Sequence, residues 1–464
     1  MYLRHLSIKR MKRIRELSLS FEHDGKPRGW TVLIGENGTA KTTILQAIAL
    51  ACAGSYFAGG LPKAIDTLRD RRDDETMEID ATFELHEGIE AFEMAFETGL
   101  RLAPKSLVMM PALAPPYETS MNGRMPPRNS PAGDILSAVR GQTEPAPDYF
   151  AIGYGISRAL PDPALTPQLN HPAIDRLRPL FEAQSSIQAT AFANHFVDRD
   201  RATGRKRGET SRRFAKLLKE ALILGGDGFF PKINDVELRG SGGVTSASDL
   251  ISTDRFTQKF GRNERKIPGS SLSHGYQSTF AWVADLIGHY MLEAGEDVQA
   301  TKDLRGLVLI DELDLYLHPT WQASFVGALK RIFPNMQFVA TTHSPVLLSG
   351  LAPHEIVRLG VDEESGDVVR LAYDDDGEWS ESTSEEPSQP DPRMMTGGEL
   401  YRTWFGLDRL TPNAAGEDLR RFAFLAADAS RTEEEEEERK GLETQLTERG
   451  IGDLPKVLKR ADER

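Results

Sequence analysis

The sequence predicts an α/β protein in which helices cover a mostly parallel β-sheet. The apolar run WTVLIG at 30–35 leads through a glycine-rich loop into residues 42–54, which have helical spacing. Residues 304–360 then form a β-α-β-β series of apolar and amphipathic segments. Such alternation is typical of parallel strands, because these need a crossover connection, usually a helix.

The composition of the 464-residue chain restricts the class of protein. Apolar residues make up 39% of it, enough for a sizeable core, and no run of about 18 apolar residues predicts a membrane span. Residues 1–19 alternate and are charged, so they predict a first strand and not a signal peptide. The single cysteine, Cys52, excludes a disulfide framework and a cysteine-rich metal site, which favours a cytosolic protein.

The net charge of −14 lies mainly near the C-terminus. The stretch from Asp374 onward holds 24 acidic and 13 basic residues, a balance of −11, so the body can still present basic patches to nucleic acid. Residues 374–393 lack a core-forming pattern and predict a disordered acidic linker. We expect the N-terminal lobe of a head, a helical insertion, the C-terminal lobe of the head, the acidic linker and a C-terminal helical region. Their boundaries are 1–165, 166–225, 226–373, 374–396 and 397–464.

A phosphate-binding loop, GENGTAKTT, follows the strand at 30–35 and opens a helix. Its backbone N–H groups and the helix dipole suit the phosphates of a nucleotide. Lys41 would reach the β- and γ-phosphates and Thr42 would bind Mg²⁺, whereas Ala40 stands where glycine is usual. The predicted nucleotide-binding residues are Gly35, Glu36, Asn37, Gly38, Thr39, Ala40, Lys41, Thr42 and Thr43.

Three polar residues follow later strands of the predicted sheet. LVLIDE places Asp311 at the end of an apolar strand, facing the water shell of the metal, and Glu312 where it would position or deprotonate an attacking water. TTHSP places His343 at the end of the next strand, where it would contact the γ-phosphate or, alternatively, cap a turn. For His318 in DLYLHP we expect a structural or interface role.

The segment LSHGYQS at 272–278, here called the signature segment, precedes an apolar helical stretch, and Ser273 could simply cap that helix. The order of phosphate loop, LSHGYQS, LVLIDELD and TTHSP resembles that of ABC-type ATPase heads. The resemblance implies ATP and Mg²⁺ as cofactors. It also implies that Ser273, Gly275 and Gln277 contact the γ-phosphate held by a neighbouring chain, in a head-to-head homodimer or higher homo-oligomer.

The signature segment lies far beyond the phosphate loop, with Ser273 232 positions after Lys41. This spacing resembles the RecF/SMC/OLD branch, in which an insertion splits the head, and not the transporter ATPases. The insertion lacks sustained heptads, which excludes a long coiled-coil arm. Residues 310–350, YGISR (Tyr154 to Arg158) and YRTWFGLDRL in the tail resemble the Septu ATPases of prokaryotic antiphage systems and their retron-associated relatives.

This resemblance implies an ATP-hydrolysing sensor or switch that controls a separate effector, of the nuclease type. The chain shows no nuclease constellation of its own, which favours a separate effector. The alternative is a DNA-repair or chromosome-maintenance ATPase of RecF/SMC type that binds DNA without an effector. Neither function involves a membrane.

Four further features have two interpretations each. Arg158 could contact the nucleotide or couple the insertion to it, or form a surface salt bridge. The basic run within 199–213 could neutralise nucleic-acid phosphates or be a solvated loop. Glu433–Glu438 could be a solvated helix face or a partner surface. An apolar group in the tail could bind the partner or pack on the head; its members are Leu400, Trp404, Phe405 and Leu407.

Overall fold

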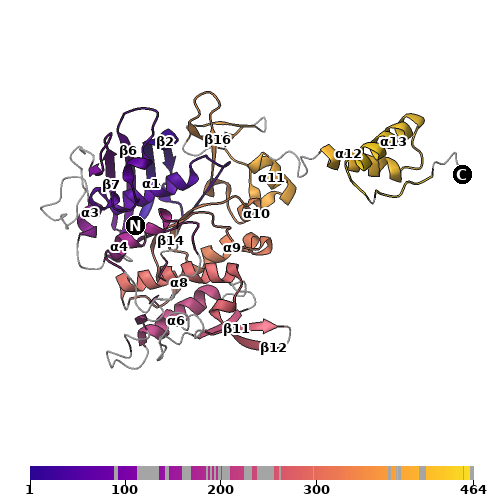
Figure 1. Ribbon diagram of the computed structural model, residues 1–464. Coiled ribbons are helices and arrows are strands. Elements are labelled where there is room, and N and C mark those ends of the chain that lie inside the picture. Colours follow the sequence, from indigo (N-terminus) through magenta and orange to yellow (C-terminus); the bar gives the residue numbers. More distant parts are fainter. Residues whose placement is uncertain are drawn as a thin grey trace. The chain divides into compact units, whose positions relative to one another are not determined.

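The computed structural model describes residues 1–87, 92–111, 135–141, 146–158, 169–183, 187–188, 191–192, 195–196, 200, 209–223, 233–237, 255–260, 263–295, 297–374, 378–382, 384, 388–406, 414–452 and 454–459. The chain divides into two compact units, Met1–Met395 and Thr396–Arg464 (Figure 1). Among the helices described, none combines the length and apolar character that crossing a membrane requires.

The first unit contains a seven-stranded sheet with the order β17-β16-β15-β5-β14-β13-β9. The five strands from β15 to β9 run parallel, and β16 and β17 are antiparallel to their neighbours. The parallel strands β5, β14 and β13 are buried throughout, because both faces of the sheet are covered. In sheet order the seven strands span Trp379–Glu381, Val368–Tyr373, Ile356–Val361, Trp30–Ile34, Met336–Thr341, Gly306–Ile310 and Ala151–Tyr154. The predicted mostly parallel sheet is confirmed.

A second, antiparallel sheet has the order β2-β1-β6-β7-β8. Helix α1 (Lys41–Ala53) contacts strands of both sheets, and every residue in it except Thr42 is buried. The principal apolar core therefore surrounds α1, and the last residues of the phosphate loop form the first turn of this helix. The strands of this sheet, from β2 to β8, span Ile14–Ser20, Tyr2–Met11, Met77–Glu87, Phe92–Leu102 and Met110–Pro111.

Two long helices, α8 (His274–Ala294) and α6 (Glu209–Leu222), lie side by side in the first unit (Figure 1). Helix α8 packs on the segment around β9, where its Trp282 ring lies 5.9 Å from the ring of Tyr154. Helix α9 (Pro319–Ile332) connects β13 to β14. The other helices that the structure describes in this unit are α2 (Ser55–Ala58), α3 (Ile135–Arg140), α4 (Pro172–Asp175) and α10 (Pro345–Leu348).

Several short elements complete the first unit. A three-stranded antiparallel sheet joins β10 (Ile233–Glu237), β11 (Arg255–Phe260) and β12 (Asn263–Pro268). A two-stranded ribbon joins β3 (Glu22–His23) and β4 (Lys26–Pro27). The 3₁₀ turns η1 to η7 span Ile65–Leu68, Pro147–Tyr149, Arg178–Leu180, Gly269–Ser271, Thr301–Asp303, Pro353–Glu355 and Pro392–Met394.

The prediction of a disordered linker over 374–393 is wrong for part of that stretch. Residues 379–381 form the edge strand β17, which pairs with β16. The indole of Trp379 lies under the guanidinium of Arg358 at 4.2 Å and beside the ring of Tyr373 at 5.2 Å. This aromatic anchor holds an otherwise acidic segment against the sheet, because cation–π and ring contacts replace the missing apolar pattern.

The second unit contains α11 (Gly397–Phe405), α12 (Ala414–Ala427) and α13 (Glu433–Glu448). Helices α12 and α13 pack together around Phe422, Ala426 and Leu446. In α11 the side chains of Leu400 and Trp404 are buried, with 3% and 1% exposed. Trp404 is therefore not an exposed docking residue; Phe405 is partly buried, and Leu407 lies outside the described residues.

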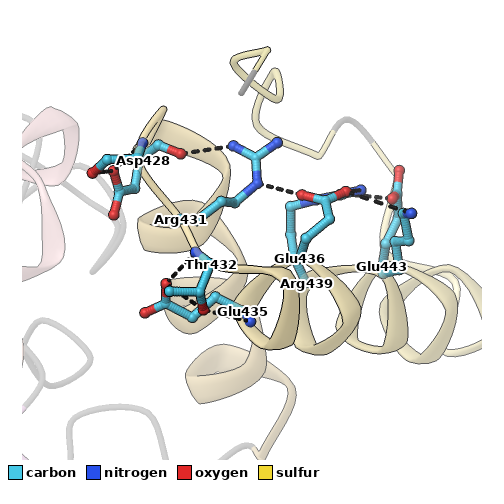
Figure 2. Close-up of polar contacts among 9 residues, drawn as sticks. Asp428, Arg431, Thr432, Glu435, Glu436, Arg439 and Glu443 are labelled. Atoms are coloured by element: carbon cyan, nitrogen blue, oxygen red, sulfur yellow. Dashed lines mark hydrogen bonds and ion pairs between the residues drawn. The ribbon is translucent and has the colours of Figure 1, made fainter. Parts of the chain in front are cut away.

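Charged pairs stabilise the start of α13 (Figure 2). Arg431 donates to the carbonyl of Asp428 at 2.7 Å and to the carboxylate of Glu436. Arg439 also donates to Glu436, at 3.0 Å, and these bonds lower the pKa of that carboxyl to about 2. Thr432 and Glu435 form a capping box. Glu435 and Glu436 of the acidic run at 433–438 thus form bonds inside this unit.

Candidate functional site

The phosphate loop joins β5 to α1, as the sequence predicts, and positive φ angles define its path. Gly35 and Gly38 have φ angles of 153° and 88°, and a side chain on Gly35 would lie 2.6 Å from the carbonyl oxygen of Leu359. Ala40 also has a positive φ, of 60°, at the N-terminus of α1. Glycine is usual at such a position because a Cβ atom crowds the backbone there.

Lys41 lies within the loop and holds its shape. Its ammonium donates to the carbonyl oxygens of Gly35 at 2.7 Å and Glu36 at 2.8 Å. Burial lowers the pKa of Lys41, and the nearby carboxylate of Asp311 opposes that shift. The charge thus sits where the phosphates of a nucleotide would need it.

Asp311 directly follows β13 and is held by two hydroxyl groups. Thr42 donates to one carboxylate oxygen at 2.8 Å, and Thr341 donates to the other at 2.6 Å. A hydroxyl and a carboxylate at this distance fit Mg²⁺, which uses few protein oxygens and completes its shell with phosphates and water. Among the described residues, no group of three or more His, Cys, Asp or Glu side chains is placed to hold a metal ion. Thr42 and Asp311 would hold the ion.

Glu312 follows directly and has a left-handed backbone, with φ of 48°. Its N–H donates to the Thr341 hydroxyl at 2.7 Å. His343 lies at the same cleft, and partial burial together with the charge of Lys41 lowers its pKa, so its ring is neutral near pH 7. A carboxylate can accept a proton or a hydrogen bond, and a neutral imidazole can either accept or donate one.

These residues line one cleft of about 320 Å³. The cleft brings together the predicted Asn37, Gly38, Ala40, Lys41, Thr42, Thr43, Asp311, Glu312 and His343, and it also includes Thr341. Two basic residues, Lys12 and Arg13, were missed. They form the turn between β1 and β2, and Arg13 donates to the carbonyl of Gly38 at 3.3 Å. A short turn carrying two adjacent cations is the one local signal that could have pointed to them.

The structure excludes one of the two sequence interpretations of Arg158, the surface salt bridge. Its side chain is 2% exposed, so a surface salt bridge is excluded, and it is not among the residues lining the cleft. Its guanidinium donates to the backbone carbonyls of Gly155, Asp311 and Glu312. It thus supports the two predicted catalytic-site carboxylate residues from behind.

The signature segment lies outside the cleft described above. Ser273 is exposed at the N-terminus of α8, and its hydroxyl makes no cap hydrogen bond. Gly275 leaves no room for a side chain, because a Cβ atom would lie 2.6 Å from the carbonyl oxygen of Tyr316. The Gln277 amide donates to the carbonyl of Leu272 at 2.7 Å. The structure therefore does not bring these residues together with Lys41 in one chain.

Two other candidate features are placed by the structure. The ring of His318 accepts from the Thr320 N–H at 3.4 Å and so caps α9, a structural role. Of the basic run at 199–213, only Arg212 and Arg213 are among the described residues. Arg213 donates to the carbonyl of Gly295 at 3.4 Å.

Several segments of the chain are similar to AAA domains and to curated proteins, one of which is named a probable ATPase. Residues 5–99 match a family described as "AAA domain", and 162–349 match "AAA domain, putative AbiEii toxin, Type IV TA system". Septu protein PtuA of Bacillus thuringiensis is 37% identical over 26% of this chain and 31% of its own length. Septu protein PtuA of Bacillus mycoides (strain KBAB4) is 24% identical over 96% of this chain and 50% of its own.

A further relative is the Retron Vc95 probable ATPase of Vibrio cholerae, 37% identical over 20% of this chain and 18% of its own length. The chain thus spans half or less of the length of these curated relatives. Among solved structures, an SMC head bound to the C-terminal winged-helix domain of ScpA aligns with a TM-score of 0.44 and 15% identity. That alignment covers 80% of this chain and 98% of the other.

The phosphate loop, the strand-terminal Asp311–Glu312 pair and His343 occur in the predicted order and meet at one cleft. The matched families are described as AAA domains, and one curated relative is named a probable ATPase. The chain therefore carries a site of the P-loop ATPase kind and is related over these segments to Septu protein PtuA and to the retron ATPases.

Proposed function

We propose that this protein binds and hydrolyses ATP with Mg²⁺ and acts in the cytoplasm as a switch in prokaryotic antiphage defence, controlling a separate effector. The observation that supports the ATPase part best is the bond from Thr42 to Asp311, because a hydroxyl and a carboxylate beside Lys41 suit a metal ion and its nucleotide. The similarity to Septu and retron proteins supports the role in defence.

The roles of the residues follow from their positions. Lys41 and the loop N–H groups bind the phosphates, and Thr42 and Asp311 hold the metal. Glu312 positions or deprotonates the attacking water, and His343 contacts the γ-phosphate. Ser273 is exposed at a helix N-terminus, which suits an anion, and in this proposal it serves the ATP of a second chain.

Sandwiching ATP between two chains would create a two-state element, closed with ATP and released after hydrolysis. The helical hairpin of α12 and α13 is our candidate for carrying that change to the effector, which we propose is a nuclease. The hairpin has a small core of its own, and Phe424 on it is 62% exposed. Because Trp404 is buried, α11 is not part of this proposed surface.

The test uses the complete chain co-expressed with the product of the neighbouring gene. We expect protection of cells against phage with the wild-type chain and none with Lys41→Ala. Truncation after Gly406 should retain ATP binding and α11 but abolish co-purification with the neighbouring product. If the truncated protein keeps that partner, the hairpin is not the docking element. If Lys41→Ala protects as well as wild type, the defence function does not depend on ATP.

One observation favours the alternative function of an ATPase that binds DNA. A second cleft of about 520 Å³ shares Lys12 and Arg13 with the nucleotide cleft and also contains Arg69 and Arg71. These four cations make no salt bridge with the described residues, whereas Arg72 beside them pairs with two carboxylates. Tight, salt-dependent binding of the isolated chain to duplex DNA, lost with Arg71→Glu, would support this function. If the isolated chain does not bind duplex DNA, this alternative function is excluded.

A further inference from the structure

We propose that Arg158 is a positioning residue for ATP hydrolysis, which fixes the backbone of Asp311 and Glu312 without touching the nucleotide. The inference rests on the proposed ATPase activity. Arg158 lies in the loop that follows β9, and strand β9 pairs with β13 in the sheet.

The contacts of Arg158 are confined to backbone carbonyls. The guanidinium donates to Gly155 at 2.9 Å, to Glu312 at 2.6 Å and to Asp311. It forms no salt bridge with any residue that the structure describes. Burial lowers its pKa to about 10, so the group keeps its charge at neutral pH. A buried charge is costly unless it is well bonded, and here its bonds hold consecutive residues of the catalytic segment.

The residue that Arg158 holds has an uncommon backbone. Glu312 has φ of 48°, which an L-residue other than glycine adopts only when its surroundings impose it. Its carbonyl is held by Arg158 and its N–H by the hydroxyl of Thr341, at 2.7 Å. The peptide is thus fixed at both ends, and Thr341 also orients the Asp311 carboxylate.

This arrangement controls the direction of the Glu312 side chain. If the peptide relaxed from the left-handed conformation, the carboxylate would move relative to the cleft that it lines. Misplacement of a reacting group by about 1 Å can slow a reaction about 100-fold. Arg158 does not line that cleft, so its loss should affect turnover more than ATP affinity.

The experiment compares Arg158→Lys and Arg158→Met with wild type. Lysine can reach one carbonyl but cannot span two with a fork, so it should retain more activity than methionine. We expect kcat to fall at least about tenfold with methionine while KM and ATP affinity change less than about twofold. In a Glu312→Gln background, Arg158→Lys should have no further effect on residual turnover, because its action passes through Glu312.

A matched control is Arg176→Lys. Arg176 is also a buried arginine that donates to a backbone carbonyl, that of Ala151, but it pairs with Glu293 away from the cleft. We expect this control to lower thermal stability while leaving kcat close to that of wild type. If the two arginine substitutions lowered kcat equally, Arg158 would have only a general structural role.

A readout independent of turnover separates this inference from the proposed function. Amide hydrogen exchange in the peptide covering residues 311–313 should become about tenfold faster in Arg158→Met, with exchange in α13 unchanged. Unchanged exchange at 311–313, or wild-type kcat in a folded Arg158→Met protein, would overturn the inference. A wild-type protein that lacks turnover but shows the local exchange effect would contradict the ATPase proposal and leave the positioning of Glu312 by Arg158 supported.

Discussion

The hydroxyl of Thr42 donates a hydrogen bond of 2.8 Å to the carboxylate of Asp311, although 269 positions separate the two residues in the chain. The bond connects the first turn of α1 to the end of β13. It exists because parallel strands end at one edge of the sheet, where the helix after β5 also begins. The pairing of Thr42 with Asp311, which we propose holds the metal, is therefore a product of sheet topology.

Asp311→Asn tests this pair. The amide keeps the shape of the side chain but removes the charge that a divalent cation needs. We expect affinity for ATP with Mg²⁺ to fall about tenfold, while affinity measured in EDTA changes little. Titration of a fluorescent ATP analogue under both conditions checks this, and an equal loss in EDTA would show that Asp311 supports the fold and not the metal.

Ala40→Gly tests backbone strain in the phosphate loop. Ala40 has φ of 60°, which costs an L-residue about 1–2 kcal/mol that glycine avoids. Part of this gain is offset by the larger entropy of glycine in the unfolded chain. We expect the free energy of unfolding to rise by up to about 1 kcal/mol in urea denaturation.

The matched control for this change is Ala49→Gly, in the buried interior of α1. The same substitution there should destabilise by about 1 kcal/mol, because glycine weakens a helix interior. Destabilisation of similar size at both positions would show that the loop conformation of Ala40 carries no strain.

Asp285 gives the fold a defined dependence on pH. It is buried in α8, accepts from the Tyr154 hydroxyl at 3.1 Å and the Gln188 N–H at 2.5 Å, and faces His289, whose pKa burial keeps well below its usual value. Burial raises the pKa of Asp285 from 3.8 to about 7. A raised carboxyl pKa means that the folded state binds the proton more tightly. The contribution of Asp285 to stability is therefore present at low pH and is lost as pH rises through 7.

The measurement is thermal or urea unfolding at several pH values for wild type and Asp285→Asn. Asparagine keeps an acceptor for Tyr154 but cannot ionise. Between pH 5 and pH 8 we expect wild type to lose about 1–3 kcal/mol relative to the variant. Parallel curves for the two proteins would show that Asp285 does not titrate in this range.

Mixing two inactive variants tests whether the signature segment works across chains. Lys41→Ala disables the phosphate loop, and Ser273→Arg disables the signature segment. In a mixed dimer one of the two composite sites carries neither substitution, so an equal mixture should recover up to about a quarter of wild-type turnover. If confirmed mixed oligomers show no turnover at any ratio, each chain hydrolyses ATP alone.

Local sequence predicted the parts of the site that lie on a single strand-loop-helix unit. The loop at 35–43 and the pair Asp311–Glu312 could be found because apolar strands precede them directly. Their meeting at one edge followed from the expectation of parallel strands. The left-handed conformation of Ala40 could not be predicted in this way, because the residue type alanine carries no sign of a positive φ.

Other features depend on distant partners and left little local signal. Arg158 reaches Glu312 from 154 positions away, and the sequence could not show that its partners are backbone carbonyls. The strand β12 has exposed residues along most of its length and is held by pairing with β11, so it shows no apolar alternation. Trp379 converts part of an acidic stretch into a strand through its contact with Arg358, which no local pattern predicts.

The most direct test of the central proposal compares ATP binding and turnover in wild type, Lys41→Ala and Glu312→Gln. Lys41→Ala removes the charge that stabilises the phosphates, whereas Glu312→Gln keeps the shape of the side chain but cannot accept a proton. We expect Lys41→Ala to lose ATP binding, and Glu312→Gln to bind ATP as wild type does while turnover falls at least about 100-fold. Equal loss of ATP binding in both variants, or wild-type turnover in Glu312→Gln, would contradict the roles assigned to this cleft.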